Sequence, residues 1–88
     1  MVTGIGDKTS ARQRRRLLWA EKLQAQLDFL GWTTKRFVHE LNEAGCPVKR
    51  QAVDQWLSGK TAPEPENQAY IAKVLRSAPH LLFPVEAA

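Results

Sequence analysis

Side chains that suggest chemistry are concentrated in residues 49–58, KRQAVDQWLS. On a helix the polar residues of this stretch share one face and the apolar ones share the other, at spacings of three and four. Arginine can bind guanine O6 and N7 with two hydrogen bonds, and glutamine can bind adenine N6 and N7 similarly. We therefore interpret Arg50 and Gln51 as candidate base readers. Gln55 either reads a further base or holds Arg50 in place, and an ordinary solvated helix surface is the alternative.

Metal binding or nucleophilic catalysis would require His39, Cys46 or His80. His39 and Glu43 stand at positions i and i+4, a helical spacing that allows two side chains to share a ligand. A zinc site needs three or four protein ligands, and a cysteine nucleophile needs a base and an orienting group. Because nothing else clusters with these residues, we expect no metal ion, no cofactor and no catalytic residue.

Helices must position the polar stretch, because apolar residues recur at helical spacing along most of the chain. Residues 1–10 lack this periodicity and are predicted to be a flexible tail. We predict helices over residues 11–30, from Thr34 to about Asn42, over 49–58, and from Pro65 or Glu66 up to Pro79. The prediction is a compact all-α bundle of four to five short helices over residues 11–78, followed by a short apolar segment, 79–88.

The predicted core consists of the apolar residues that share one face of each helix. They are Leu17, Ala20, Leu23, Leu27 and Leu30, then Phe37, Val38 and Leu41, then Val53, Trp56 and Leu57, and finally Ile71, Val74 and Leu75. Trp19 and Trp32 lie outside these stripes. Each of the two tryptophans either covers the edge of the core or contributes to a dimer contact.

The net charge of +4 is distributed unevenly along the 88 residues. Residues 1–50 hold ten Lys and Arg against five Asp and Glu, whereas residues 51–88 hold three against four. This asymmetry favours a surface that contacts phosphate. We find no apolar run long enough for a membrane span, no signal-peptide core and only one cysteine, so we expect a cytoplasmic protein.

The stretch from about Leu17 to Ser77 resembles the DNA-binding domain of the lambda-repressor-like family, also called Cro/C1 or XRE-type. The motif QAVDQWLSGKTAP is similar to the end of that family's recognition helix and the loop that follows it. The motif NQAYIAKVLRS is similar to the helix that packs on the recognition helix. The resemblance implies a helix-turn-helix whose second helix enters the major groove of double-stranded DNA.

Carried over position by position, the resemblance implies two groups of contacts. Base contacts would come from Lys49, Arg50, Gln51, Asp54 and Gln55. Phosphate contacts would come from Thr34, Lys35, Arg36, Ser58, Lys60 and Thr61. The cluster ARQRRR adds Arg14, Arg15 and Arg16, either as phosphate contacts or as the solvated first turns of a helix.

The chain also departs from the family in four places. Two are single positions, since Leu57 stands where the family often has Glu and Thr34 stands where it often has Gln. The link NEAGCPVK is longer than the usual tight turn, so either the recognition helix is reoriented or the second helix runs one turn further. Lys49 stands where the family usually has Ser or Thr as helix cap, and an ammonium group cannot accept a hydrogen bond. These departures affect the individual base contacts more than DNA binding itself.

The expected function is therefore that of a transcriptional regulator, a repressor or Cro-like protein, bound as a homodimer to a pseudo-palindromic site. The dimer contact is predicted at Leu81, Leu82 and Phe83, and packing of this segment on the first helix is the alternative. No small-molecule ligand is evident. Two other functions remain open: a protein-interaction adaptor on the same fold, such as an antitoxin-like or polymerase-binding protein, and a non-specific nucleoid protein.

Overall fold

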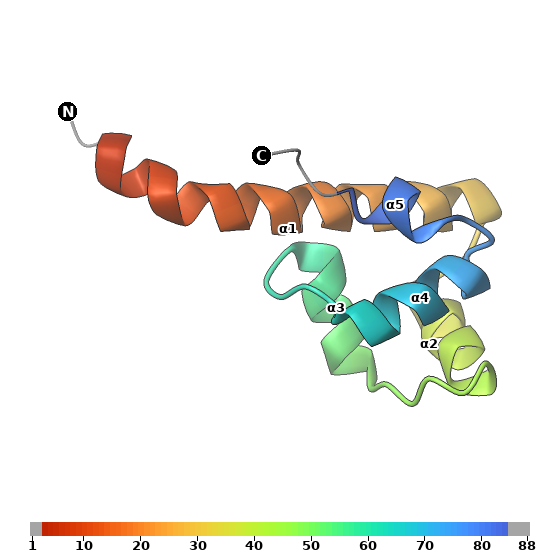
Figure 1. The fold of residues 1–88 in the computed structure, drawn as a ribbon. Coiled ribbons are helices and arrows are strands. Elements are labelled where there is room, and N and C mark those ends of the chain that lie inside the picture. The colour runs from red at the N-terminus through yellow and green to blue at the C-terminus, as the bar shows by residue number, and fades with distance from the viewer. Residues whose placement is uncertain (1–2, 85–88) are drawn as a thin grey trace.

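Helices form all the regular structure between residues 3 and 84, the part of the chain that the computed structural model describes, with side chains described from residue 11 onward. In chain order they are α1 (Thr3–Leu30), α2 (Thr34–Glu43), α3 (Arg50–Ser58), α4 (Pro65–Val74) and α5 (Pro79–Leu82). The second half of α1 carries the other four helices, and its first half projects beyond them (Figure 1). The predicted all-α fold of four to five helices is confirmed.

The start of α1 differs from the prediction. A helix was expected from about residue 11 with a flexible tail before it, but α1 begins at Thr3, and only residues 1–2 of that segment lie outside the described residues. The segment contains no proline, and extending an existing helix by one residue is far easier than nucleating a new one. Without an apolar stripe, such an extension leaves no periodic signal in the sequence. No helix among the described residues has the length and apolar character needed to cross a membrane.

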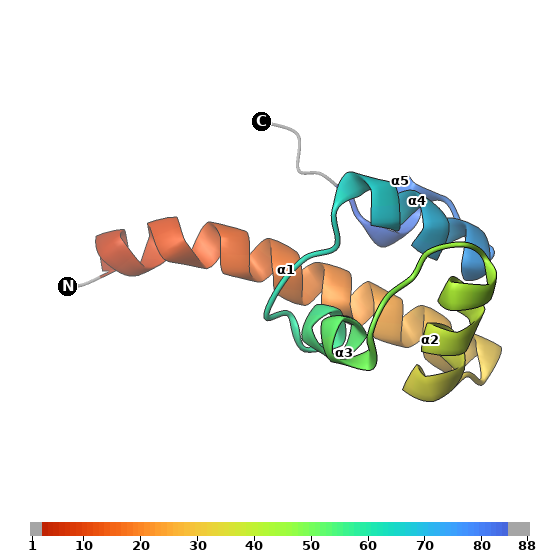
Figure 2. The same ribbon diagram turned by 90° about the horizontal axis from the view of Figure 1, so that it is seen from below.

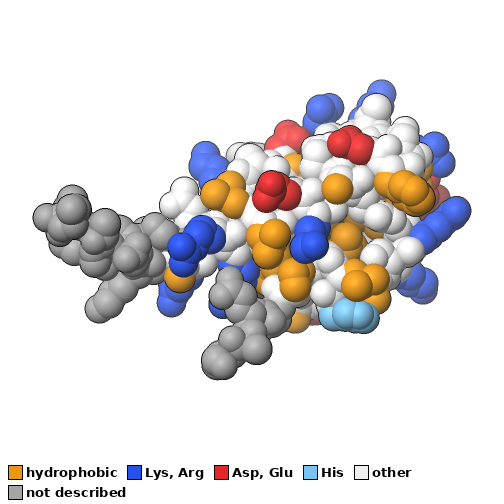
Figure 3. All heavy atoms as spheres, turned by 90° about the horizontal axis from the view of Figure 1, so that it is seen from above, with side chains coloured by type: hydrophobic (Ala, Val, Ile, Leu, Met, Phe, Trp, Pro, Cys, Tyr) orange, Lys and Arg blue, Asp and Glu red, His pale blue; other side chains and the backbone are white. Residues whose placement is uncertain are grey.

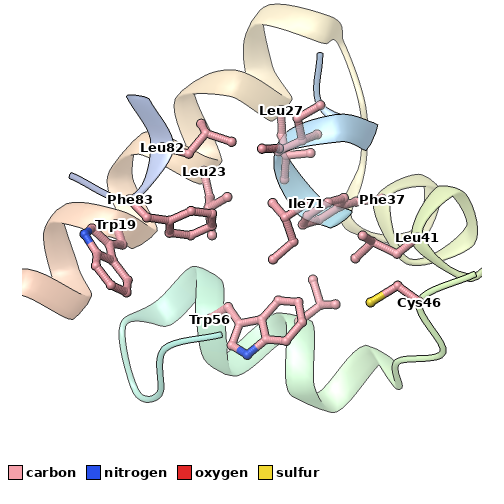
Figure 4. Close-up of a cluster of buried hydrophobic side chains, with 13 residues drawn as sticks. Trp19, Leu23, Leu27, Phe37, Leu41, Cys46, Trp56, Ile71, Leu82 and Phe83 are labelled. Atoms are coloured by element: carbon pink, nitrogen blue, oxygen red, sulfur yellow. The ribbon is translucent and has the colours of Figure 1, made fainter. Parts of the chain in front are cut away.

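The core is formed mainly by one face of each of the first four helices, and Cys46, Leu82 and Phe83 complete it. Side chains from α1, α2, α3 and α4 converge on a single cluster between the helices (Figure 4). The fully buried side chains of this cluster all belong to the predicted apolar stripes. They are Leu23, Leu27, Phe37, Leu41, Val53, Ile71 and Leu75. Leu17 is the exception to the predicted stripe, since it remains 44% exposed.

The segment after α4 packs on α1. Trp19 and Phe83 are both buried, with ring centroids 5.2 Å apart in an edge-to-face arrangement, and Trp19 Nε1 donates a hydrogen bond to Pro84 O (3.0 Å). Leu82 is buried as well, whereas Leu81 is 58% exposed. The predicted dimer contact is therefore wrong for Leu82 and Phe83, whose apolar surface is already covered within one chain. Residues 85–88 of the predicted C-terminal segment lie outside the described residues.

Gly59 joins the carboxyl end of α3 to α1. It caps α3 in the left-handed conformation (φ 79°), and its carbonyl accepts a hydrogen bond from Arg16 Nε (3.2 Å). A Cβ atom at this position would lie 2.6 Å from Leu17 Cδ2 and 3.3 Å from Leu17 Cα. The glycine is thus required twice, once by its backbone angle and once by the close approach of the two helices.

Replacing this glycine tests the contact between α1 and α3. Gly59→Ala should lower the free energy of unfolding by about 2–4 kcal/mol, because the left-handed conformation costs about 1–2 kcal/mol for an L-residue and overpacking adds about 1–3. Gly31→Ala is the matched control, since Gly31 has a similar φ of 73° but no atom within 4 Å of the added Cβ. Urea unfolding followed by circular dichroism measures both. Equal losses in the two variants would show that the approach of Leu17 contributes nothing.

Candidate nucleic-acid interface

The outer face of α3 is polar and open to solvent, as the sequence predicted. Lys49, Arg50, Gln51 and Asp54 are exposed and Gln55 is partly buried. On the opposite face Val53 and Trp56 are buried in the core, which fixes the rotation of the helix about its axis. All five predicted base-contacting side chains therefore lie on or beside one short helix with its hydrogen-bonding groups outward.

The amino end of α3 lies at the far end of the helix from α1 (Figure 1). Lys49 occupies the cap position and makes no side-chain capping hydrogen bond, as its ammonium group predicts. The first backbone donors bonded within the helix are those of Ala52 and Val53, to Lys49 O. The N–H groups before them remain available, and with the positive end of the helix dipole they favour an anion or a hydrogen-bond acceptor.

An ion pair within α3 reduces the positive charge of this face. Arg50 Nε lies 3.8 Å from Asp54 Oδ2, and the two side chains are 64% and 56% exposed. Exposed pairs of this kind contribute only about 0.2–1 kcal/mol, so a stronger partner for either side chain can replace the pair. Arg50 is therefore held near the helix surface, yet it can still be recruited by an external acceptor.

The amino end of α2 supplies three further predicted residues, and they differ in availability. Thr33, not Thr34, is the cap, since its side chain accepts a hydrogen bond from Arg36 N (3.1 Å). The Arg36 guanidinium lies 4.8 Å from the Trp32 ring and 3.7 Å from a Glu40 carboxylate oxygen. Lys35 is exposed and takes part in neither ion pair found among the described side chains. Lys35 is thus the cation at this helix end that is most available to a phosphate.

The long link between α2 and α3 is an ordered loop. Because α2 ends at Glu43, the additional residues do not extend that helix, which settles the alternative that the sequence left open. Asn42 Nδ2 donates a hydrogen bond to Val38 O (2.8 Å) within α2 and another to Val48 O (3.1 Å), so the far end of the link is tied back to α2. Seen from below, α3 and the amino end of α2 lie along the same edge of the molecule (Figure 2).

The predicted phosphate contacts at the carboxyl end of α3 fall into two groups. Lys60 and Thr61 are exposed, and their backbone N–H groups both donate to Gln55 O. Ser58 instead uses its hydroxyl to donate to the same carbonyl oxygen (3.1 Å). Arg16 is partly buried against Gly59, so its role is at least partly structural.

An open hollow of about 670 Å³ lies between α1 and the loop that follows α3, and it brings several of these residues together. Arg15, Arg16, Lys60 and Thr61 line it, whereas Arg14 does not. Sequence reasoning missed Arg12 and Gln68 as lining residues. The signal for Arg12 was present, since positions 12, 15 and 16 share one helical face.

Comparisons with protein-family models, with curated proteins and with solved structures found no match for this chain. The resemblance to lambda-repressor-like domains thus remains a prediction that rests on the sequence motifs. Among the side chains that the structure describes, no group of three or more His, Cys, Asp or Glu is placed to hold a metal ion.

Cys46 is buried in the α2–α3 link. Its thiol lies 3.4 Å from Asn67 Oδ1, to which it can donate a hydrogen bond. Burial, and secondarily the negative charge of Glu66, raises the pKa of this thiol above its ordinary value. The thiol therefore stays protonated at neutral pH, which makes it a poor nucleophile.

The raised pKa of Cys46 predicts a loss of stability at alkaline pH. The unfolded chain releases the thiol proton from about pH 8.5. The folded chain retains it to higher pH, so the free energy of unfolding decreases as pH rises through this range and is unaffected below it. Melting temperatures measured from pH 7 to 10 should fall more steeply for wild type than for Cys46→Ala. Parallel pH profiles for the two proteins would contradict the assignment, because the two proteins differ only at Cys46.

Proposed function

We propose that this protein is a sequence-specific double-stranded DNA-binding regulator of transcription, in which α2 and α3 act as a helix-turn-helix. The observation that supports this most is the two-faced structure of α3. One face is fixed in the core by Val53 and Trp56, and the other presents Arg50 and Gln51 at a free helix end. An α-helix is about 10–12 Å wide with its side chains, and the major groove is about 12 Å wide.

In this proposal α3 supplies the sequence recognition. Arg50 and Gln51 donate to base edges near the amino end, and Gln55 acts one turn later with Lys49 and Asp54 beside them. Arg50 exchanges its weak pair with Asp54 for the two acceptors of a guanine, which suit a guanidinium better. The individual contacts therefore depend on how closely α3 approaches the groove floor.

The flanking residues supply contacts to the sugar–phosphate backbone. Lys35 with Thr34 at the start of α2, and Lys60 with Thr61 after α3, come from the segments before and after the recognition helix in the chain. Such contacts determine where a protein sits on DNA and account for most of the salt dependence of binding. Base contacts determine which DNA sequence the protein prefers. Arg36 and Ser58, which already bond within the chain, have secondary roles here.

Regulation would occur by occlusion of a promoter in the cytoplasm, on the nucleoid, without cofactor, metal ion, catalytic step or small-molecule ligand. A homodimer would place two copies of α3 about 34 Å apart on a pseudo-palindromic site. With Leu82 and Phe83 buried, Leu81 is the remaining predicted contact. Hydrophobic side chains lie among basic ones on the surface of α1 and α5 (Figure 3), and Leu81 would contribute to such a dimer surface.

A protein-interaction adaptor on the same fold is the second candidate. The Arg50–Asp54 pair favours it, because a carboxylate in the middle of the polar face repels phosphate but suits a protein partner. Such an adaptor would bind random and selected DNA equally weakly. A non-specific nucleoid protein would instead bind all sequences alike, with a steep dependence on salt.

Selection of bound duplexes from a random pool at near-physiological salt tests the proposed function. Wild type should enrich one inverted repeat, and Arg50→Ala/Gln51→Ala should lose or relax it, because each bidentate contact contributes about 1–3 kcal/mol of discrimination. Lys73→Ala is the control, since it also removes one exposed positive charge but lies on α4. Enrichment of a single half-site would support base reading by α3 but contradict the proposed homodimer. An absence of enrichment would favour the adaptor.

Removing the carboxylate from α3 should strengthen DNA binding. Asp54→Asn eliminates a negative charge that faces the phosphates and releases Arg50, so binding to a random duplex should tighten about two- to tenfold at low salt. Fluorescence anisotropy with a labelled duplex measures the change. Glu66→Gln on α4 is the matched control and should leave the affinity unchanged. Unchanged or weaker binding by Asp54→Asn would argue that α3 does not face DNA.

A further inference from the structure

We infer that the hollow between α1 and the loop after α3 is a binding site for phosphate groups. Its volume of about 670 Å³ lies within the range of about 300–1,000 Å³ that is typical of small-molecule sites. Four cationic side chains line it, and no lining residue is a carboxylate. The cationic residues are Arg12, Arg15, Arg16 and Lys60.

The positive charge of the hollow comes from two separate elements. Arg12, Arg15 and Arg16 are on one face of α1, and Lys60 comes from the loop after α3. The two ion pairs found among the described side chains both lie elsewhere, within α2 and α3. Like charges held together repel one another, and an anion bound between them turns that repulsion into attraction.

The loop wall of the hollow is held in place before any ligand binds. Arg16 Nε donates to Gly59 O (3.2 Å) at the start of the loop, and Gln68 Nε2 donates to Pro63 O (2.9 Å) near its end. Between them the Lys60 N–H group donates to Gln55 O (3.0 Å). A site built on such a fixed loop loses little conformational entropy on binding, which favours affinity.

The side chains of the hollow suit phosphate better than other anions. Guanidinium groups donate two parallel hydrogen bonds to phosphate oxygens, and Thr61 adds a neutral hydroxyl donor. Trp19 also lines the hollow but is only 7% exposed, so little of its ring is available to stack on a base. The chemistry recognised is therefore that of phosphate groups, from a free oligophosphate or from a nucleic-acid backbone.

This site does not depend on the proposed base reading. It lies at the carboxyl end of α3, whereas Arg50 and Gln51 are at the amino end, and a ligand without bases is enough to test it. The two hypotheses can therefore fail separately. If only the phosphate site exists, the protein binds phosphate but prefers no DNA sequence. If only base reading exists, the protein prefers a DNA sequence but does not bind phosphate in the hollow.

Calorimetric titration with sodium tripolyphosphate at low salt tests the site. We expect saturable binding to wild type, weakened about tenfold or more by Arg15→Gln, because charge-assisted hydrogen bonds are strong. Arg14→Gln is the matched control, since it removes one charge at the neighbouring position but does not line the hollow. It should change the affinity less than twofold. Equal weakening by both variants, or no binding to wild type, would overturn the inference.

A second pair of variants tests the site from the loop side and identifies the source of the phosphate. Lys60→Gln should weaken tripolyphosphate binding from the loop side, whereas Lys73→Gln should not, and melting curves establish that all variants are folded. If Lys60→Gln and Arg15→Gln also weaken binding to a random duplex, and tripolyphosphate competes with that duplex, the hollow holds the nucleic-acid backbone. If duplex binding is unchanged, it holds a free oligophosphate. Normal tripolyphosphate binding by folded Lys60→Gln would overturn the two-sided site.

Discussion

The contact of Gly59 with α1 is the constraint on which the rest of the structure depends. Because the backbone of this glycine lies directly against Leu17 and its carbonyl is held by Arg16, the carboxyl end of α3 is fixed on α1. The amino end of α3 must then point away from α1, and its polar face is left outside the core. The same contact begins the loop that walls the basic hollow. One close approach between two helices thus sets the geometry at both ends of α3.

The sequence predicted the fold well wherever apolar residues repeat at helical spacing. The faces of α1 to α4 and the exposure of Arg50 and Gln51 followed from that repeat, and the closing role of Gly59 followed from the preference for glycine at a helix end. Periodicity identifies which side of a helix is buried but not what buries it. For Leu82 and Phe83 the pattern therefore left both a second chain and α1 open, and in the structure the ring of Trp19 covers Phe83 within the same chain.

The basic cluster was predictable as a charge but not as a site. Consecutive arginines point in different directions around a helix, so Arg14 leaves the group that Arg12, Arg15 and Arg16 form. Which of these directions faces another element depends on where the loop after α3 runs, and that is set by tertiary contacts such as the Gln68–Pro63 hydrogen bond. The start of α1 was not predicted because this part of the helix packs against no other helix. It therefore needs no apolar stripe that could be seen in the sequence.

Under the proposed function, different residues would supply the affinity for DNA and the specificity for its sequence. Within α3 the charges of Arg50 and Asp54 cancel, so among the residues that would read bases only Lys49, at the cap, adds general attraction to DNA. Further cationic side chains lie on α1, at Lys60 in the loop after α3 and at Lys35. Phosphate contacts supply most of the affinity for DNA and base contacts supply the discrimination. A neutral recognition helix between basic flanks therefore limits binding to wrong sequences, because α3 stabilises a complex only where its hydrogen bonds are matched.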